Sequence, residues 1–125
     1  MAILLGMVCV ADKARAEGFY ADVLGPVLGL GLVEPDAYGV QFTGATAQVR
    51  LTLIPDWQPG PHPVLGWVVA DIGATVAALA ARGLAMQHYP CMGMDERGIV
   101  ATEAGNHLAW FNDSEGNVLM LAQRP

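Results

Sequence analysis

The chain has few charged residues and no run of basic side chains. Its 12 acidic and 6 basic residues among 125 give a formal net charge of −6. No cluster of Lys and Arg is present that could neutralise several phosphates at once, which argues against nucleic acid as a partner. The acidic balance favours cationic small molecules only through long-range attraction, so it identifies no site.

Cysteine and long hydrophobic runs are also scarce. Cys9 and Cys91 lack the spacing of zinc or redox motifs, and two thiols do not make a disulfide framework. We therefore expect two buried, reduced thiols in a cytoplasmic protein. The apolar residues 1–10 follow no Lys or Arg and are too few to span a bilayer, so we predict a buried first strand there and no membrane partner.

Apolar residues, in contrast, make up 54% of the chain, enough for the core of a single domain over residues 1–125. A strand-to-helix pattern occurs twice in it. Val10-Ala11-Asp12 and Val69-Ala70-Asp71 each follow an apolar run and precede a stretch with helical periodicity. The repeat predicts two modules, and the three prolines in residues 59–63 predict a linker between them.

Both predicted helices begin at an aspartate and end at a glycine. Asp12 and Asp71 are expected N-caps, because a carboxylate accepts from the free amides of the first helical turn. Gly25 and Gly83 are expected to supply the left-handed residue that ends each helix. Apolar residues recur at helical spacing in both segments, so each helix must cover an apolar surface.

Short segments rich in branched and aromatic residues follow each helix and predict strands. They are Val40–Thr43, Gln48–Ile54, Leu84–Tyr89, His107–Asn112 and Val118–Ala122. Residues 112–117 predict a hairpin turn between the last two strands. In the strand after Gln48, alternation predicts Val49 and Leu51 beneath the first helix, with Arg50 and Thr52 on the opposite face.

Two motifs carry a resemblance to a known family. Phe19-Tyr20-Ala21-Asp22-Val23-Leu24-Gly25 and Asn112-Asp113-Ser114-Glu115-Gly116-Asn117 resemble signatures of the vicinal oxygen chelate superfamily, which includes glyoxalases, bleomycin-resistance proteins and dioxygenases. Other segments resemble an uncharacterised bacterial branch of it, with about four residues inserted around 26–29. The resemblance implies an α+β fold of two tandem βαβββ modules, about 1–55 and 64–125, joined by a linker at about 56–63. It also implies a curved mixed sheet around a cavity, helices on the convex face, and often a homodimer.

The resemblance further implies where a metal would bind. In the superfamily's enzymes, residues of the first and last strand of each module hold a divalent ion that polarises vicinal oxygens of the substrate. The corresponding residues here are Leu5, Arg50, Val64 and Met120. Leu and Val have no lone pair, Arg stays protonated and a thioether selects soft ions, so we expect neither a metal nor another cofactor.

Without a metal, the same positions predict an apolar pocket with a few polar points. Its expected ligand-binding residues are Leu5, Met7, Arg50, Thr52, Val64, Val68, Trp110 and Met120. Arg50 either forms a salt bridge or grips a carboxylate or phosphate of the ligand. Trp67 is expected beneath the second helix instead.

The remaining reactive residues give weaker signals. His62 is expected at the surface of the linker, whereas His88 and His107 are read as core or edge histidines with cavity contacts as the alternative. Met92 and Met94 lie in a glycine-containing loop that suits a flexible lid.

Three functions agree with this reading. The first is a metal-independent small-molecule-binding protein, a homodimer that sequesters an antibiotic or metabolite. The second is a glyoxalase-type lyase, isomerase or dioxygenase with an atypical metal site. The third is a metal-free enzyme that uses Arg50 and a histidine.

Overall fold

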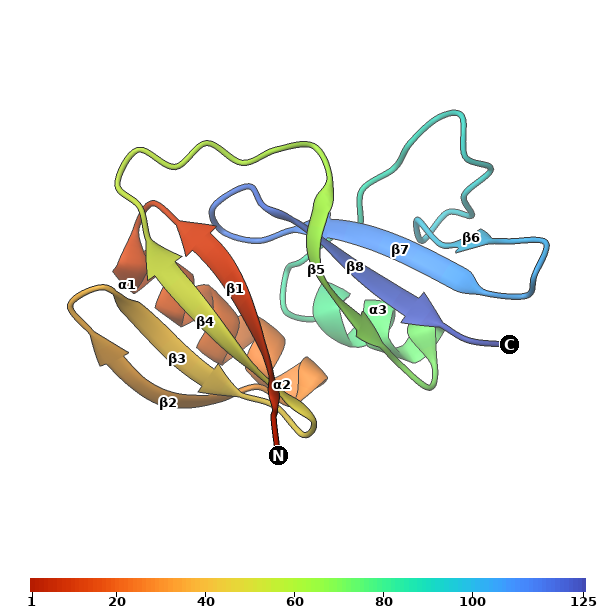
Figure 1. Cartoon of the computed structure of the whole chain (residues 1–125). Helices are drawn as coiled ribbons and strands as arrows, with labels where there is room; N and C mark the ends of the chain where they lie inside the picture. Colours follow the sequence, from red (N-terminus) through yellow and green to blue (C-terminus); the bar gives the residue numbers. More distant parts are fainter. The chain divides into compact units, whose positions relative to one another are not determined.

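The computed structural model describes all 125 residues and consists of two compact units. Unit 1 comprises residues 1–60 together with 113–116, and unit 2 comprises residues 61–112 and 117–125. Each unit holds one four-stranded mixed sheet with helices on one face, so the predicted α+β fold of two βαβββ modules is confirmed (Figure 1). No helix is both long and apolar enough to cross a membrane.

The sheet of unit 1, sheet A, has the strand order β1-β4-β3-β2. The strands are β1 (Leu4–Val10), β2 (Gly31–Asp36), β3 (Gly39–Thr43) and β4 (Ala47–Leu53). β1 pairs in parallel with β4, and the other pairs are antiparallel. The predicted strands near β3 and β4 are confirmed. β2 was not predicted, because it is an edge strand with all six residues exposed and shows no buried alternation.

The prediction of a buried first strand is wrong for half of β1. Val8 and Val10 are buried beneath the helices, whereas Leu5 and Met7, on the other face, are 46% and 62% exposed. Leu4, at the start of the strand, is on the side of Val8 but is 74% exposed. Alternate side chains of a strand point to opposite faces, and helices cover only one face of this sheet. The apolar run therefore supplies both a core face and an exposed face.

The first helical region is longer and less regular than predicted. It consists of α1 (Lys13–Gly18), a π-helical segment η1 (Phe19–Leu24) and α2 (Gly25–Leu28). Asp12 is the N-cap, and its Oδ1 accepts from the Arg15 backbone N–H at 3.0 Å, as expected. The left-handed residue that ends the helix is Gly29, with φ of 77°, so the expected stop at Gly25 is wrong.

The helical irregularity lies directly before Pro26. The Gly25 N–H donates to the Tyr20 carbonyl, a bond across five residues that is typical of a π-helix. Pro26 has no N–H and occupies the first turn of α2, where none is needed. Residues 26–29, which look inserted in the sequence, thus form the extra turn and its stop.

The core of unit 1 lies between these helices and sheet A. Tyr20, Leu24, Phe42 and Leu51 are fully buried in it, and the rings of Tyr20 and Phe42 lie 6.1 Å apart. Buried Val49 and Leu51 share the helix-covered face of β4, whereas half-buried Arg50 and Thr52 lie on the other face, as the alternation predicted.

The sheet of unit 2, sheet B, has the strand order β5-β8-β7-β6. Its strands are β5 (Pro63–Val68), β6 (Val100–Ala101), β7 (His107–Asn112) and β8 (Val118–Gln123), and its helix is α3 (Ile72–Ala80). Asp71 caps α3 by accepting from the Ala74 N–H at 3.0 Å, and Gly83 follows with φ of 85°, both as predicted. Trp67 pairs with buried Leu121 and stacks on buried Phe111, which places it on the helix-covered face as expected.

The predicted strand Leu84–Tyr89 does not form a ladder. Only the Gln87 N–H donates to β7, to the Trp110 carbonyl at 2.7 Å, while the Gln87 side chain donates to Asn112. The short strand β6, absent from the prediction, pairs with the start of β7 instead. Because β6 already occupies part of the free edge of β7, only Gln87 of the segment Leu84–Tyr89 bonds to β7.

Candidate functional site

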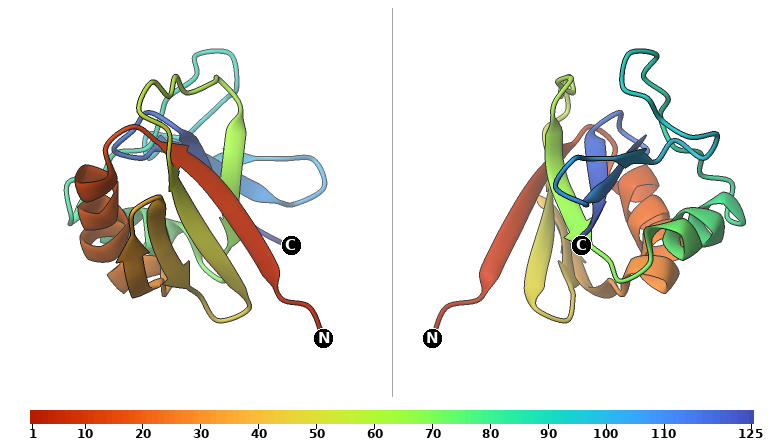
Figure 2. Two further views of the ribbon diagram at one scale, coloured as in Figure 1. Left: turned by 60° about the vertical axis from the view of Figure 1, so that its left-hand side comes forward. Right: turned by 90° about the vertical axis from the view of Figure 1, so that its right-hand side faces the viewer.

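In each unit the helices lie against one face of the sheet and leave the other face open (Figure 2). We call these surfaces open face A and open face B. Open face A carries Leu5 and Met7 of β1 and Arg50 and Thr52 of β4, with Met7 directly opposite Arg50. These are four of the eight residues expected to bind a ligand, and they form one continuous surface with an exposed apolar edge.

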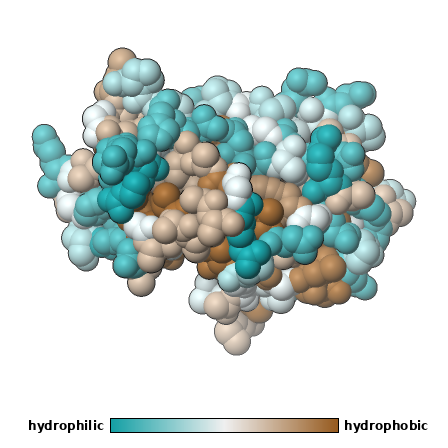
Figure 3. Space-filling view, turned by 180° about the vertical axis from the view of Figure 1, so that it is seen from behind, coloured by the Kyte–Doolittle hydropathy of each residue, from teal (hydrophilic) through white to brown (hydrophobic).

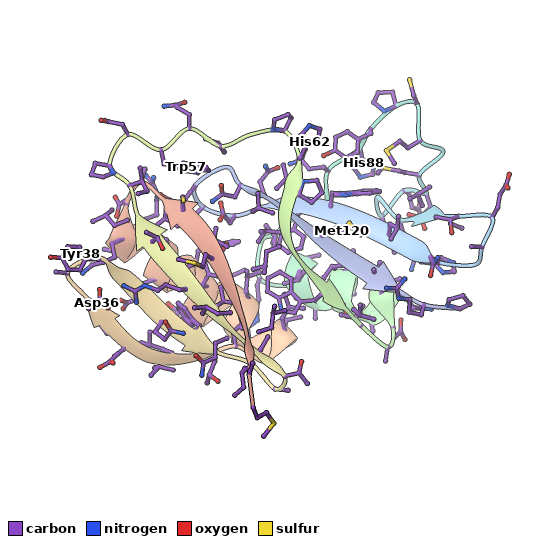
Figure 4. The ribbon with its side chains drawn as sticks, in the orientation of Figure 1. Asp36, Tyr38, Trp57, His62, His88 and Met120 are labelled. Atoms are coloured by element: carbon purple, nitrogen blue, oxygen red, sulfur yellow. The ribbon has the colours of Figure 1, made fainter.

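Arg50 of β4 is engaged by a residue of β2, which is two strands away in sheet A. Its Nη2 donates to Oδ1 of Asp36 at 3.0 Å, and the two side chains are 22% and 46% exposed. The hydrogen bond from Arg50, assisted by the Tyr38 backbone N–H, lowers the pKa of Asp36 to about 2. Figure 4 shows Asp36 and Tyr38 together at the end of β2. Of the two expected roles of Arg50, the salt bridge is therefore present within the sheet.

The Thr52 hydroxyl is the second polar group of open face A. Its Oγ1 is shielded from solvent and has no hydrogen-bond partner in the protein. Because buried polar atoms are nearly always hydrogen-bonded, this oxygen is available to a ligand or a water.

Open face B carries the other four expected residues, Val64, Val68, Trp110 and Met120. Val64 and Val68 are 48% and 64% exposed, and Met120 pairs with Trp110 on one side. On its other side Met120 pairs with Gly66, where a Cβ would lie only 3.1 Å from the Met120 carbonyl oxygen. A hollow of about 180 Å³ opens beside Met120, which Figure 4 labels on β8.

An aromatic pair extends open face B beyond the hollow. The ring of Tyr89 meets that of Trp110 edge-on, with centroids 5.9 Å apart and an interplanar angle of 78°. This geometry is favourable for the ring quadrupoles and holds the Trp110 ring in place. Trp110 is half-buried, so part of it contributes surface to open face B.

Comparisons with solved structures cover nearly the whole chain. A member of the glyoxalase/bleomycin resistance protein/dioxygenase superfamily from Sphaerobacter thermophilus matches with a TM-score of 0.72 and 21% identity, covering 99% of this chain and 98% of that one. The chain has the vicinal oxygen chelate fold. A lactoylglutathione lyase from Agrobacterium tumefaciens matches with a TM-score of 0.73 and 17% identity, over 98% of this chain and 92% of that one.

A third protein with the vicinal oxygen chelate fold is an antibiotic-binding protein from Streptomyces sp. CB03234. It matches with a TM-score of 0.69 and 24% identity, covering all of this chain and 97% of that one. No family model matches the chain, and no curated protein sequence does. The chain is thus similar to these proteins in structure over nearly its full length, and no sequence comparison adds to this.

The metal positions of the vicinal oxygen chelate fold do not fit a hard metal ion in this chain. Leu5, Arg50, Val64 and Met120 offer no carboxylate or imidazole, and Arg50 is a cation that already binds Asp36. No three His, Cys, Asp or Glu side chains come together in a group that could hold a metal.

The histidines lie apart from these surfaces or at their margins (Figure 4). His62 is exposed just before β5, as predicted, and His88 is exposed in the irregular segment after α3, so its reading as a core or edge histidine is wrong. His107 is half-buried at the start of β7, and its Nδ1 is shielded without a hydrogen-bond partner.

The sulfur-containing residues differ in part from the predictions. Neither Cys9 nor Cys91 forms a disulfide, but Cys9 is half-buried and Cys91 exposed, so the expectation of two buried thiols is wrong. Cys9 is only half-buried because β1 turns that side chain to open face A. In the loop proposed as a lid, the Met94 sulfur accepts from the Tyr89 N–H at 3.3 Å, while Met92 is 41% exposed.

A buried polar cluster was missed by the sequence analysis. Oε1 of Glu115 accepts from the Ala11 and Asp12 N–H groups, and its carboxylate pairs with Arg15. Burial alone would raise the pKa of Glu115. The hydrogen bonds from Arg15, from Ser114 and from the Asp12 and Ala11 backbone N–H groups outweigh burial and lower the pKa to about 2. Beside it, the Tyr20 hydroxyl donates to Asp113 at 2.7 Å.

This cluster has no local signal in the sequence. Glu115 lies in a hairpin turn where exposed carboxylates are common, and nothing near it in the chain indicates that Arg15 is its partner. Burial and the nearby Asp113 charge raise the pKa of Tyr20, so its hydroxyl stays protonated and donates. We assign the cluster a structural role, because both acidic residues are buried and fully engaged.

Proposed function

We propose that the chain is a metal-independent binding protein that holds a small, partly aromatic or apolar organic molecule against an open face of a sheet. The observation that carries the proposal is the set of residues at the metal positions. Leu5 and Val64 there are about half exposed, so the surface that would hold a metal is an apolar contact surface. Apolar walls with a few polar points are typical of small-molecule sites.

The polar points favour a ligand that carries hydrogen-bonding groups. On open face A these are the Arg50 guanidinium and the unpartnered Thr52 hydroxyl. On open face B the half-buried Trp110 offers a ring for stacking, and the hollow beside Met120 offers room. A planar aromatic molecule with hydroxyl or carboxyl substituents matches both surfaces.

Sequestration of an antibiotic is the biological role that we favour. Its support is the antibiotic-binding protein from Streptomyces, which shares the fold over the full chain at 24% identity. The lactoylglutathione lyase shares the same fold, but the residues at the metal positions here do not support that chemistry.

We also propose that the protein is a homodimer. β1 is an edge strand, and its Leu5 and Met7 side chains are exposed together on open face A. Contiguous exposed apolar surface of this kind marks an interaction site. Sedimentation equilibrium is expected to give twice the chain mass of 13.2 kDa, and a monomer would contradict this part of the proposal.

Metal content is the first test of the function. We expect purified, tag-free protein to contain no stoichiometric metal, and Mn²⁺, Fe²⁺, Ni²⁺ and Zn²⁺ not to raise its melting temperature, because a ligand that binds the native state must stabilise it. Stoichiometric metal with a rise in melting temperature would favour the glyoxalase-type enzyme instead.

Ligand binding is the second test, with matched variants. Planar aromatic antibiotics are titrated against the protein while tryptophan fluorescence is followed. Val68→Asp places a charge on open face B and is expected to weaken binding, whereas Ala78→Asp, on the exposed side of α3, is the control. Equal binding by both variants, or binding by neither variant nor wild type, would count against the proposal.

A further inference from the structure

A second hollow lies on the opposite side of sheet B from open face B. It has a volume of about 330 Å³ and is lined by α3 and the segment that follows it. Its apolar wall consists of Val76, Ala77, Ala80, Leu84, Ala85 and Met86. The view from behind shows hydrophobic side chains, in brown, between hydrophilic ones (Figure 3).

On the α3 side, the residues at the margin of the hollow are small. Ala77 and Ala80 are exposed positions of α3 that end at Cβ, so they leave the groove beside buried Val76 and Met86 uncovered. A helix that only had to cover a core would gain by carrying larger apolar residues at its margin. The short residues therefore leave room for another apolar group.

The outer wall is formed by an ordered turn. Oδ1 of Asp95 accepts from the backbone N–H groups of Arg97 and Ile99, at 2.8 and 3.0 Å. Gly98 brings this turn against the neighbouring segment, since a Cβ there would lie 2.9 Å from the Met86 Cβ. Its φ of 85° also favours glycine. The turn is thus held in place before any ligand binds.

One charged group at the hollow has spare hydrogen-bonding capacity. Asp95 Oδ2 holds Nε and Nη2 of Arg97, at 3.2 and 2.9 Å, which orients the guanidinium. Nη1 accordingly lies over the first turn of α3, 2.7 Å from where a Cβ of Gly73 would be, and Asp71 Oδ1 lies 3.5 Å from the same point. The side-chain hydrogen bonds of Arg97 run from Nε and Nη2, so Nη1 keeps its hydrogens for another acceptor. An oriented guanidinium nitrogen beside an apolar hollow suits a carboxylate.

We propose that this hollow is a second binding site, which takes a small apolar monocarboxylate. The apolar part of the ligand packs on Ala77, Ala80 and Leu84, and the carboxylate accepts from Arg97 Nη1. Glu96, also at the rim, disfavours a second negative charge on the ligand. The site is independent of the open faces, because its lining shares no residue with either of them.

The test uses octanoate as the probe, with octanamide as its neutral counterpart. Methyl NMR spectra are expected to show shifts of Ala77, Ala80 and Met86 on titration with octanoate. Ala80→Leu fills the hollow and is expected to weaken octanoate binding about tenfold, through lost apolar contact and overpacking. Ala78→Leu, an exposed position of α3 outside the hollow, is the control and is expected to bind as wild type does.

Arg97→Gln separates the charge from the apolar contact. It is expected to weaken octanoate binding about tenfold and to leave octanamide binding unchanged, since only the carboxylate gains a charge-assisted bond. The proposal is overturned if the Ala77, Ala80 and Met86 methyls do not shift, if Ala80→Leu binds as tightly as Ala78→Leu, or if the shifts appear at Val68 and Met120 instead. The last result would place octanoate on open face B.

Discussion

Oε2 of Glu115 accepts a hydrogen bond from Arg15 Nε at 2.7 Å, although 100 positions separate the two residues in the sequence. The Glu115 side chain is 0% exposed, whereas that of Arg15 is 56% exposed. Because the backbone N–H groups of Ala11 and Asp12 also donate to Glu115, the carboxylate ties the turn 113–116 to the start of α1.

Replacing this carboxylate by an amide is expected to destabilise the fold. In Glu115→Gln the side chain keeps its size, but one carboxylate oxygen is replaced by an NH₂ group. That group cannot accept hydrogen bonds from Arg15 or from the Ala11 and Asp12 N–H groups. We expect the free energy of unfolding to fall by about 2 kcal/mol, measured by urea denaturation. Glu103→Gln, at an exposed turn, is the control and should change it little; equal effects of the two variants would contradict the role of Glu115.

The same carboxylate predicts a loss of stability in acid. The pKa of Glu115 is lowered from 4.5 to about 2 in the folded protein, so its ionised form favours folding. This stabilisation is fully present above the unfolded pKa and is lost as the pH falls from about 4.5 toward 2, because protons then bind preferentially to the unfolded chain. Urea denaturation at a series of pH values should show a smaller decline for Glu115→Gln than for wild type. Parallel declines would assign the acid sensitivity to other groups, of which Asp36 is one.

Tyr20→Phe is expected to leave the buried Asp113 carboxylate with one donor fewer. Tyr20 is fully buried, and its hydroxyl donates to Asp113 Oδ2 at 2.7 Å. Loss of a buried hydrogen bond to a charged group costs about 1–3 kcal/mol of unfolding free energy. Tyr38→Phe is the matched control, because Tyr38 is 77% exposed. A similar melting temperature for both variants would show that the Tyr20 hydroxyl contributes nothing.

Replacement by alanine is expected to have opposite effects on stability at Gly25 and at Gly18, two glycines of the first helical region. A Cβ at Gly25 would lie 2.8 Å from the Leu30 carbonyl oxygen, whereas nothing lies within 4 Å of one at Gly18. Both have helical φ, at −53° and −60°. Gly25→Ala should therefore destabilise the protein by about 1–3 kcal/mol through overpacking, and Gly18→Ala should stabilise it by about 0.4–1 kcal/mol. Thermal unfolding of both variants checks the pair, and a stabilised Gly25→Ala would show that the π-helical turn is loosely packed.

Several features of the fold were predictable because they depend on neighbours in the sequence. Asp12 and Asp71 cap their helices through bonds to residues three positions later. The alternation in β4 separates buried Val49 and Leu51 from Arg50, since successive side chains point to opposite faces. The positions of Leu5, Arg50, Val64 and Met120, in contrast, came from the resemblance to the superfamily, and their role in ligand binding stays a prediction.

Other features escaped prediction because they depend on distant parts of the chain. The segment after Leu84 has strand-like residues, but β6 already occupies part of the β7 edge. Gly25 is a different case, because its surroundings are local: it has the residue type of a helix stop, but α2 continues the helix to Gly29.

The sequence by itself determined the secondary structure of most segments, the two-module pattern and the absence of hard-metal ligands at the expected positions. These follow from residue chemistry and from interactions within a few residues. Only the tertiary structure decided that Arg50 binds Asp36, that Glu115 is buried against Arg15 and that a hollow forms beside α3. Such contacts depend on which segments the fold brings together, and local spacing carries no information about them.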